Sequence, residues 1–202
     1  MIRYMIALTL ALTTWMHAAQ EAEAKGSFSG RPGWNLRLND DTTDQLAAQL
    51  KQDFRRCQAN PKIYRYDCYR RSYRTGAQSL RGSSEYAPIA KALALVERRI
   101  GAVVEANLDP SQPKLNEALF VNHRAVKPEA LPQIKQATIA AMEEATTLLL
   151  RTPDNTQQKH FQRIAAVIQS NKVLLRSALL ELPRTLVRVA QLWSLPQLPL
   201  RG

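Results

Sequence analysis

The stretch PIAKALALVERRIGAVVEAN, residues 88–107, carries the clearest periodic pattern in the chain. Its apolar residues recur at alternating spacings of four and three positions, which is the seam of a heptad repeat. The seam consists of Ile89, Leu93, Val96, Ile100, Val103 and, at its end, Asn107. Such a seam predicts a helix that packs along its length against other helices, and the proline-rich LDPSQPK sequence ends it.

The residues before this stretch predict two more helices. The first begins near DDTTDQ, residues 40–45, where Thr42 and Gln45 fit a capping box. Pro61 ends this helix by Asn60, because the residue before a proline disfavours helical geometry. One face of the helix contains Leu46, Leu50, Phe54 and Cys57.

The second helix runs from about Tyr64 to Leu80, and Gly82 is placed to cap its end. At 100° per residue one stripe of it is rich in tyrosine. The stripe contains Tyr66, Tyr69, Tyr73, Ala77 and Leu80. Cys68 lies off the stripe near the start of the helix, which suits a bridge back to the end of the first helix.

Helices are also predicted after the heptad stretch. One covers about residues 132–151, with Ile134, Ala141, Ala145 and Leu148 on one face. The next begins near Asp154 or Thr156, with Phe161, Ile164, Ile168, Leu175, Ala178 and Leu182 on one face. Pro183 kinks or ends it, and TLVRVAQLW forms a short sixth helix.

The pattern as a whole predicts an all-α fold, an up-and-down helical bundle of about four to five helices with one intrachain disulfide. Residues 40–195 form a single helical domain in this interpretation. No segment of useful length has strand periodicity, and LNEALFV, residues 115–121, is expected to be a short helix within the connection 108–132.

Both ends of the sequence have a different character. Residues 1–24 combine a basic start, a short apolar run and the small-x-small sequence Ala22-Glu23-Ala24, which predicts a cleaved secretory signal peptide. A membrane anchor is the alternative, but the apolar run is shorter than the roughly 20 residues that span a bilayer. We therefore expect a periplasmic or secreted protein with no transmembrane segment after signal removal. Residues 25–39 read as a flexible N-terminal arm and 196–202 as a proline-rich tail.

Cys57 and Cys68 are the two cysteines of the chain. Export and an even count favour a disulfide between them, worth about 3 kcal/mol in the chain-entropy model. A redox pair is the alternative, but the spacing is not C-x-x-C. A zinc site is disfavoured because His123 and His160 are distant in sequence from the cysteines, so no metal or cofactor is predicted.

Basic residues concentrate in residues 51–81. This helical hairpin has nine lysines and arginines against two aspartates, or +7 of the net +12 that remains once residues 1–24 are removed. Arginine forks grip phosphates and carboxylates, so the hairpin is a candidate anion- or partner-binding face. Its candidate residues are Arg55, Arg56, Arg65, Arg70, Arg71, Arg74, Tyr69 and Tyr73. A structural interpretation is compatible with this one: the tyrosines are core residues, and the arginines pack their aliphatic stems beside them with the guanidinium groups in water.

Sequence motifs for catalysis are lacking: no nucleophile elbow, Walker loop or H-E-x-x-H occurs. His123 lies in the proline-bounded connection, where functional loops often lie, but a lone histidine without a positioned partner is interpreted as a surface or capping residue. His160 is interpreted as a surface residue, and Glu143-Glu144 as a solvated pair. Carboxylates on different elements, such as Glu85, Glu97 and Glu105, are left as possible partners of one another.

The sequence therefore favours a non-enzymatic secreted or periplasmic module. Its hairpin 51–81 would bind an anionic envelope component (lipid head group, lipopolysaccharide or polymer) or another envelope protein. The alternative is a hydrolase of envelope polymers that uses carboxylates assembled by the fold. Nucleic acid is disfavoured by the export signal, and a membrane-surface role by the tyrosine-rich stripe.

Overall fold

Five α-helices and one short β-hairpin account for the regular structure of residues 37–118, 121–151 and 155–177, the part of the chain that the computed structural model describes. The helices are α1 (Asp40–Ala59), α2 (Lys62–Ser79), α3 (Ala87–Ala106), α4 (Leu131–Leu150) and α5 (Asn155–Ser177). The strands are β1 (Leu115–Ala118) and β2 (Val121–His123), and the 3₁₀ helix η1 (Pro128–Ala130) precedes α4. The predicted all-α bundle with one disulfide is confirmed.

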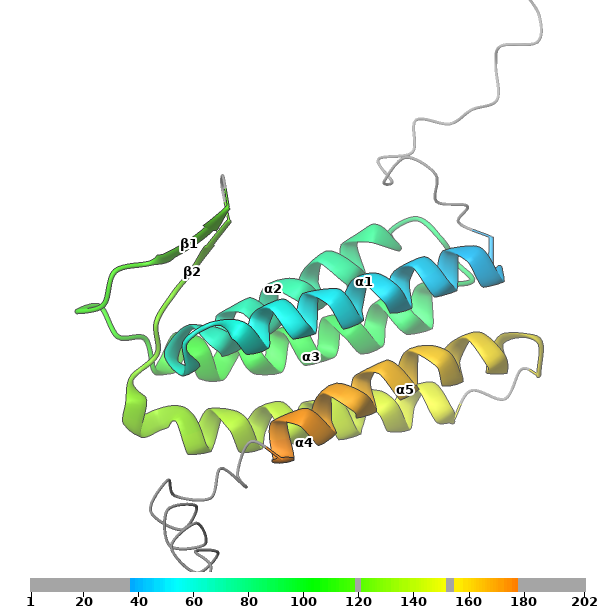
Figure 1. Cartoon of the computed structure of the whole chain (residues 1–202). Helices are drawn as coiled ribbons and strands as arrows, with labels where there is room; N and C mark the ends of the chain where they lie inside the picture. Colours follow the sequence, from blue (N-terminus) through cyan, green and yellow to red (C-terminus); the bar gives the residue numbers. More distant parts are fainter. Residues whose placement is uncertain (1–36, 119–120, 152–154, 178–202) are drawn as a thin grey trace, which may run out of the picture.

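The helices run up and down, and each packs on the next one in sequence. Helix α1 also packs on α5, which closes the bundle. Figure 1 shows α1, α2 and α3 on one side and α4 and α5 on the other. The heptad seam of α3 lies at the centre, where Ile89, Leu93, Val96 and Ile100 are fully buried. Among the described residues no helix is both long and apolar enough to cross a bilayer.

Helix α1 begins one turn earlier than its predicted cap. Asn39 is the N-cap residue, and its side chain accepts a hydrogen bond from the Thr42 backbone N–H. The capping box predicted on Thr42 and Gln45 is therefore wrong. The Thr42 backbone N–H that the Gln45 side chain would bind already donates to the side-chain oxygen of Asn39. Asn60 caps the end of α1 before Pro61, as predicted.

Helix α2 approaches its neighbours closely at Gly76. A Cβ atom there would lie 3.2 Å from Leu50 Cδ2 and 3.3 Å from Leu93 Cδ1, so a glycine lets the three helices meet. After α2 the chain turns at Gly82, whose φ of 89° is a conformation that favours glycine.

Two predictions on the second half of the chain are wrong. LNEALFV does not form a helix, because Leu115–Ala118 pairs antiparallel with Val121–His123. In α4, Leu148 is 48% exposed and Leu149 takes its place in the core.

The connection between α3 and α4 is pinched at its base. The Lys127 N–H donates to the Asn107 carbonyl at 3.0 Å, and the Asp109 N–H donates to the Ala125 carbonyl at 3.0 Å. An isolated bridge joins Leu108 to Val126 between these bonds. The β-hairpin therefore leaves and rejoins the bundle at almost one point (Figure 1).

Several expectations fall outside the described residues. They are the signal peptide 1–24, the arm up to residue 36, the helix turn with Ala178 and Leu182, the sixth helix and the tail 196–202. Of the arm, Leu38 packs against the core and its N–H donates to Glu85.

Candidate functional site

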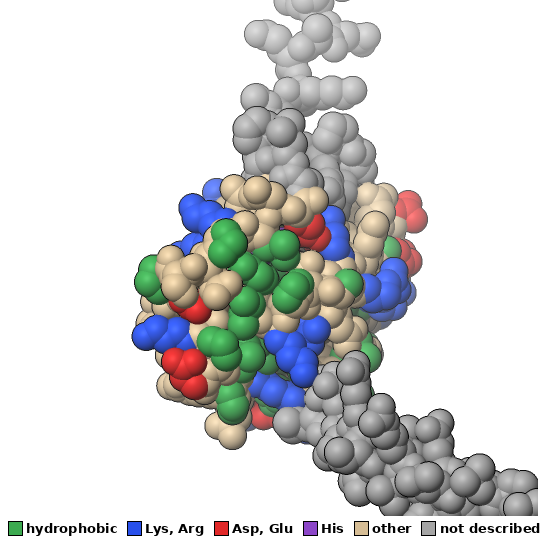
Figure 2. All heavy atoms as spheres, turned by 60° about the vertical axis from the view of Figure 1, so that its left-hand side comes forward, with side chains coloured by type: hydrophobic (Ala, Val, Ile, Leu, Met, Phe, Trp, Pro, Cys, Tyr) green, Lys and Arg blue, Asp and Glu red, His purple; other side chains and the backbone are tan. Residues whose placement is uncertain are grey.

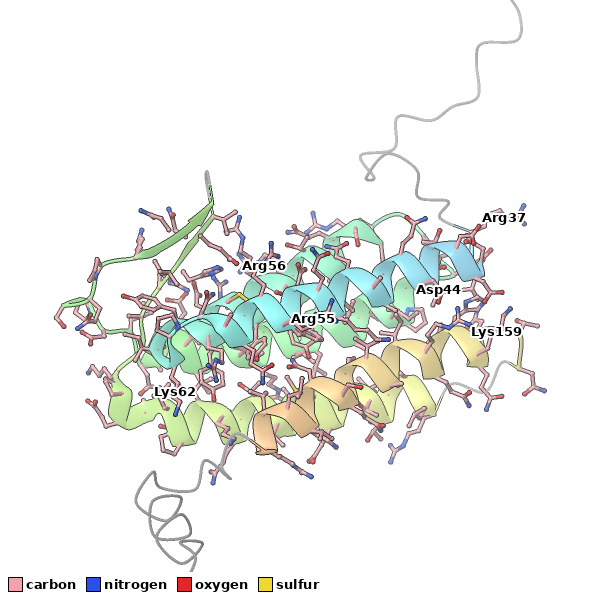
Figure 3. The ribbon with its side chains drawn as sticks, viewed as in Figure 1. Arg37, Asp44, Arg55, Arg56, Lys62 and Lys159 are labelled. Carbon is pink, nitrogen blue, oxygen red and sulfur yellow. A yellow bond between two sulfur atoms is a disulfide. The ribbon has the colours of Figure 1, made fainter. Side chains whose placement is uncertain are left out.

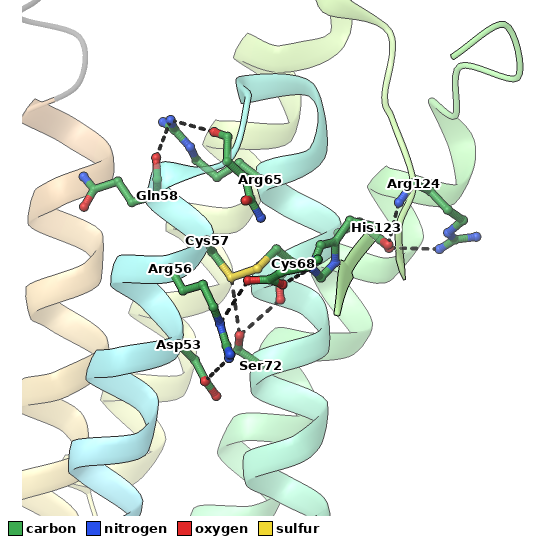
Figure 4. Close-up of a disulfide and its surroundings, with 12 residues drawn as sticks. Asp53, Arg56, Cys57, Gln58, Arg65, Cys68, Ser72, His123 and Arg124 are labelled. Atoms are coloured by element: carbon green, nitrogen blue, oxygen red, sulfur yellow. Dashed lines mark hydrogen bonds and ion pairs between the residues drawn. A yellow bond between two sulfur atoms is a disulfide. The ribbon is translucent and has the colours of Figure 1, made fainter. Parts of the chain in front are cut away.

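A disulfide joins the last turn of α1 to the first half of α2. Cys57 and Cys68 are bonded, their Cα atoms are 5.4 Å apart, and both residues are buried. The predicted pairing is confirmed, and Figure 4 shows the bridge between the two helices.

The β-hairpin brings His123 to this disulfide. The strand that ends in His123 is held on α2 by two backbone contacts, from the Arg124 N–H to Asp67 and from the Val126 N–H to the Ile63 carbonyl. His123 is only 1% exposed, and its Nε2 lies 2.5 Å from Glu117 Oε2 on the facing strand. The interpretation of His123 as a surface or capping residue is therefore wrong, because the fold buries it beside a carboxylate and a disulfide that are not its neighbours in sequence.

A polar pocket of about 320 Å³ opens between this hairpin and the α1–α2 pair. We call it the disulfide pocket; Asp53, Arg56, Cys68, Glu117 and His123 are among the residues that line it. Arg56 contacts both carboxylates of this set, Asp53 and, at 3.1 Å, Glu117 (Figure 4). Each acid of the pocket is thus held by the same guanidinium.

The carboxylates considered as partners of one another contact different groups. Glu85 accepts a hydrogen bond from the Leu38 N–H, Glu97 binds Arg74, and Glu105 binds Arg124. The structure does not bring these three acids together.

A buried ion-pair network lies next to the disulfide pocket. Asp67, 2% exposed, accepts hydrogen bonds from Arg70 Nε at 2.9 Å, from Arg124 Nη2 at 3.1 Å and from the backbone N–H of Arg124 at 3.0 Å. Burial alone would raise the pKa of Asp67, but these hydrogen bonds and the two positive charges outweigh it and hold the pKa below its usual value. Arg70 and Arg74 continue the network to Glu97 on α3.

Several of the predicted site residues therefore have structural partners. Arg56, Arg70 and Arg74 are in ion pairs, and Arg65 donates to the carbonyls of Gln58 and Asn60 at the end of α1. Arg71 is exposed and lines the disulfide pocket. Arg55, beside Arg56 in sequence, is exposed on another side of α1 (Figure 3).

The two candidate tyrosines are part of the core. Tyr69 and Tyr73 have no exposed surface, and both pack against Phe54 of α1, with ring centroids 6.0 and 5.1 Å apart. Burial raises the pKa of Tyr69 to about 12 and that of Tyr73 further still. Neither side chain is placed to touch a ligand in solvent.

A second hollow, of about 380 Å³, lies between α2 and α3. Ala77, Ala90 and Ala94 line it together with four basic residues and one acid, and we call it the cationic groove. Its charged residues are Arg74, Arg81, Lys91, Arg98 and Glu97. Among the described residues Arg81, Lys91 and Arg98 have no ion pair or side-chain hydrogen bond, whereas Glu97 is already bound by Arg70 and Arg74. The sequence pointed to Arg74 through its charge run but not to Lys91 or Arg98, which follow in the next helix.

His160 is a further correction, because it is buried rather than on the surface. Its Nδ1 lies 2.8 Å from Thr43 Oγ1, which in turn lies 2.9 Å from the Tyr86 hydroxyl. Burial lowers the pKa of His160 in spite of nearby Asp40, so the ring is neutral at pH 7. Outside it, Lys159 binds Asp40 and Arg163 binds Asp44, which ties α5 to the start of α1 (Figure 3).

A smaller hollow of about 180 Å³ lies where α2 begins and α4 starts, lined by apolar residues such as Tyr66 and Leu131 beside Lys62 and Lys135. Figure 2, which turns this end of the bundle forward, shows a band of hydrophobic side chains with lysines and arginines beside it. Acidic side chains are interspersed on the same face, so its charge is mixed.

No protein-family model, curated protein or solved structure matches this chain. What the protein binds must therefore follow from its own side chains, above all from the cationic groove and the disulfide pocket.

Proposed function

We propose that this protein is a non-enzymatic helical module that binds a phosphate-bearing component of the cell envelope in the cationic groove. The observation that carries the proposal is the set of three cations, Arg81, Lys91 and Arg98, that have no partner among the described residues and line one hollow.

The chemistry of the groove suits a phosphate. The planar guanidinium groups of Arg81 and Arg98 can each bind two phosphate oxygens at once, and Lys91 adds a compact positive charge. The alanines that line the groove are short, so an anion can come close to both helices. Like charges gathered around one hollow repel each other, and a bound anion removes that repulsion.

Export of the protein is part of the proposal. Disulfides persist in oxidising compartments such as the periplasm or the cell exterior, and the Cys57–Cys68 bond agrees with the signal peptide predicted from the sequence. An envelope phosphate, on a lipid head group or on a polymer, is the anion that such a protein would meet.

The test is a binding measurement on a groove variant with Arg81, Lys91 and Arg98 all changed to Gln. The matched control changes Lys51, Arg55 and Arg151 to Gln, which removes the same charge from exposed positions outside the groove. Two probes separate the sources of phosphate: vesicles of phosphatidylglycerol and phosphatidylcholine, and soluble polyphosphate.

We expect the groove variant to lose at least about tenfold in affinity for one of these probes, since three charge-assisted contacts disappear. The control should lose about twofold or less, through weaker general attraction that salt also screens. Equal losses in the two variants, or no binding to either probe by the wild type, would overturn the proposal. Variants of Arg70 or Arg74 are unsuitable, because both residues hold Glu97 in place.

A further inference from the structure

The disulfide pocket contains a set of metal-binding atoms. Cys68 Sγ, a carboxylate oxygen of Glu117 and a ring nitrogen of His123 all lie within 4.8 Å of one another. Cys57 Sγ is bonded to Cys68 Sγ and so belongs to the same cluster. In the oxidised protein the S–S bond occupies both sulfurs, and thiolate is the form of cysteine that binds metals.

His123 has a buried ring nitrogen without a hydrogen-bond partner among the described residues. A carboxylate only accepts hydrogen bonds, so the contact of His123 Nε2 with Glu117 Oε2 places the ring proton on Nε2. The lone pair is then on Nδ1, which is buried and has no hydrogen-bond partner among the described residues. Histidines that bind metals usually donate their other ring N–H to a carboxylate in this way.

The charges around the cluster also suit a metal ion. Two thiolates balance one Zn²⁺, and the negative charge of Glu117 is balanced by Arg56, 3.1 Å away. Ser72 Oγ lies 3.5 Å from Cys57 Sγ, within reach of a thiolate. The pocket itself leaves space for a water molecule or small ligand in a fourth position.

We propose that reduction of the Cys57–Cys68 disulfide turns this cluster into a Zn²⁺ site, with the two thiolates and His123 as ligands and Glu117 positioning the imidazole ring. A phosphine supplies the two electrons that break the S–S bond. Water gives the oxygen of the phosphine oxide and the two protons of the thiols. Zn²⁺ then displaces these two protons into solvent. The metal takes over the link between α1 and α2 that the disulfide makes in the oxidised protein.

The experiment uses the protein reduced with a phosphine that is then removed without air. Co²⁺ is added as a spectroscopic probe and then displaced by Zn²⁺, and the thermal unfolding of each form is followed by circular dichroism. We expect thiolate-to-cobalt charge-transfer bands with visible bands of a tetrahedral ion, at one metal ion per chain. We also expect Zn²⁺ to raise the Tm of the reduced protein by about 5 °C or more. Zn²⁺ should leave the Tm of the oxidised protein unchanged.

Two variants decide which residues bind the ion. His123→Ala should weaken Zn²⁺ binding to the reduced protein more than about tenfold. Asn122→Ala, at the exposed neighbour on the same strand, should bind as the wild type does. Both are first shown to fold in the oxidised form. Equal affinity of His123→Ala and wild type would mean that the thiols alone bind the metal, and would overturn the site. A reduced protein that gives no cobalt bands, or that stays unfolded when Zn²⁺ is added, would overturn it as well.

Discussion

The arginine-rich hairpin has two regions that use the same residue type differently. Around the disulfide, guanidinium groups meet carboxylates: Arg56 joins Asp53 to Glu117, and Arg70 binds buried Asp67. Where α2 turns into α3, Arg81 has no such partner in the described part of the chain, and Lys91 and Arg98 join it around one groove. The difference teaches that arginines beside buried acids stabilise the fold, whereas cations remain available for binding where the one nearby acid among the described residues, Glu97, is already bound by other arginines.

The largest effect on stability should come from loss of the disulfide, in the region where the arginines are paired with carboxylates. Changing Cys57 and Cys68 together to Ser should lower the free energy of unfolding by about 3 kcal/mol, because the unfolded chain regains the entropy of the open loop. Urea unfolding followed by circular dichroism measures this. The folded variant should bind the groove probe with wild-type affinity, and a parallel loss of binding would show that the two regions are not separate.

A smaller loss is expected when the buried acid is neutralised. Asp67→Asn should cost about 2 kcal/mol at pH 7, since Arg70 and Arg124 lose a buried partner but keep Glu97 and Glu105. Arg74→Gln, at a side chain 47% exposed, is the control and should cost less than about 0.5 kcal/mol.

The same variant predicts a pH dependence. The pKa of Asp67 is held below its usual value, so its stabilisation is present above about pH 4 and is lost as pH falls through the folded-state pKa. Unfolding free energies measured from neutral to acidic pH should show the wild type and Asp67→Asn converging. A difference in unfolding free energy that stays the same at every pH would contradict the claim that the ionised Asp67 carboxylate stabilises the fold.

Tyr69→Phe should change the stability at pH 7 by less than about 1 kcal/mol, because the Tyr69 hydroxyl is buried with no hydrogen-bond partner among the described residues. In alkali the two proteins should differ in how much stability they lose. Burial raises the pKa of Tyr69 to about 12, so above about pH 10 the unfolded chain ionises first and the wild type loses stability. The variant should lose less between pH 7 and alkaline pH, and identical losses would argue against this burial.

The smallest effect on stability belongs to the groove. Arg98→Gln should leave the free energy of unfolding within about 0.5 kcal/mol of the wild type, since the side chain is exposed and lacks an ion pair in the described part of the chain. Its affinity for the groove probe should still fall severalfold. A clear loss of stability would show that Arg98 stabilises the fold, as the arginines in ion pairs do.

The local patterns in the sequence were enough to predict the bundle. The stop at Pro61 and the heptad seam of α3 from Ile89 to Ile100 depend on residues close together, and both are found as expected. Beyond Ile100 the seam prediction is wrong, because Val104 is buried in the core and the predicted Val103 is only half-buried. The stripe of α4 failed at its end for a geometric reason: a seven-residue repeat drifts by about 20° per heptad on a straight helix. By the second repeat the core position has moved from Leu148 to Leu149.

The disulfide pocket was beyond prediction because long-range contacts build it. LNEALFV contains good helix formers, yet the chain there pairs with itself, and backbone N–H groups just after the hairpin donate to the Ile63 carbonyl and the Asp67 carboxylate of α2. Only this docking buries His123 beside Cys68. Likewise the cationic groove needed the antiparallel packing of α2 on α3, which brings Arg81 to Lys91.

The pinched base of the β-hairpin has a consequence for how this molecule could change over generations. Since Asn107 and Lys127 are hydrogen-bonded neighbours, α3 and α4 are in effect joined by a very short link, whatever lies between residues 109 and 125. An insertion with such ends can change in length without moving α3 and α4 apart, provided that Arg124 keeps its contact with Asp67 and Glu117 its contact with Arg56. The other residues of the insertion are free to vary on a constant bundle, so new side chains can be brought to the disulfide pocket without a change of fold.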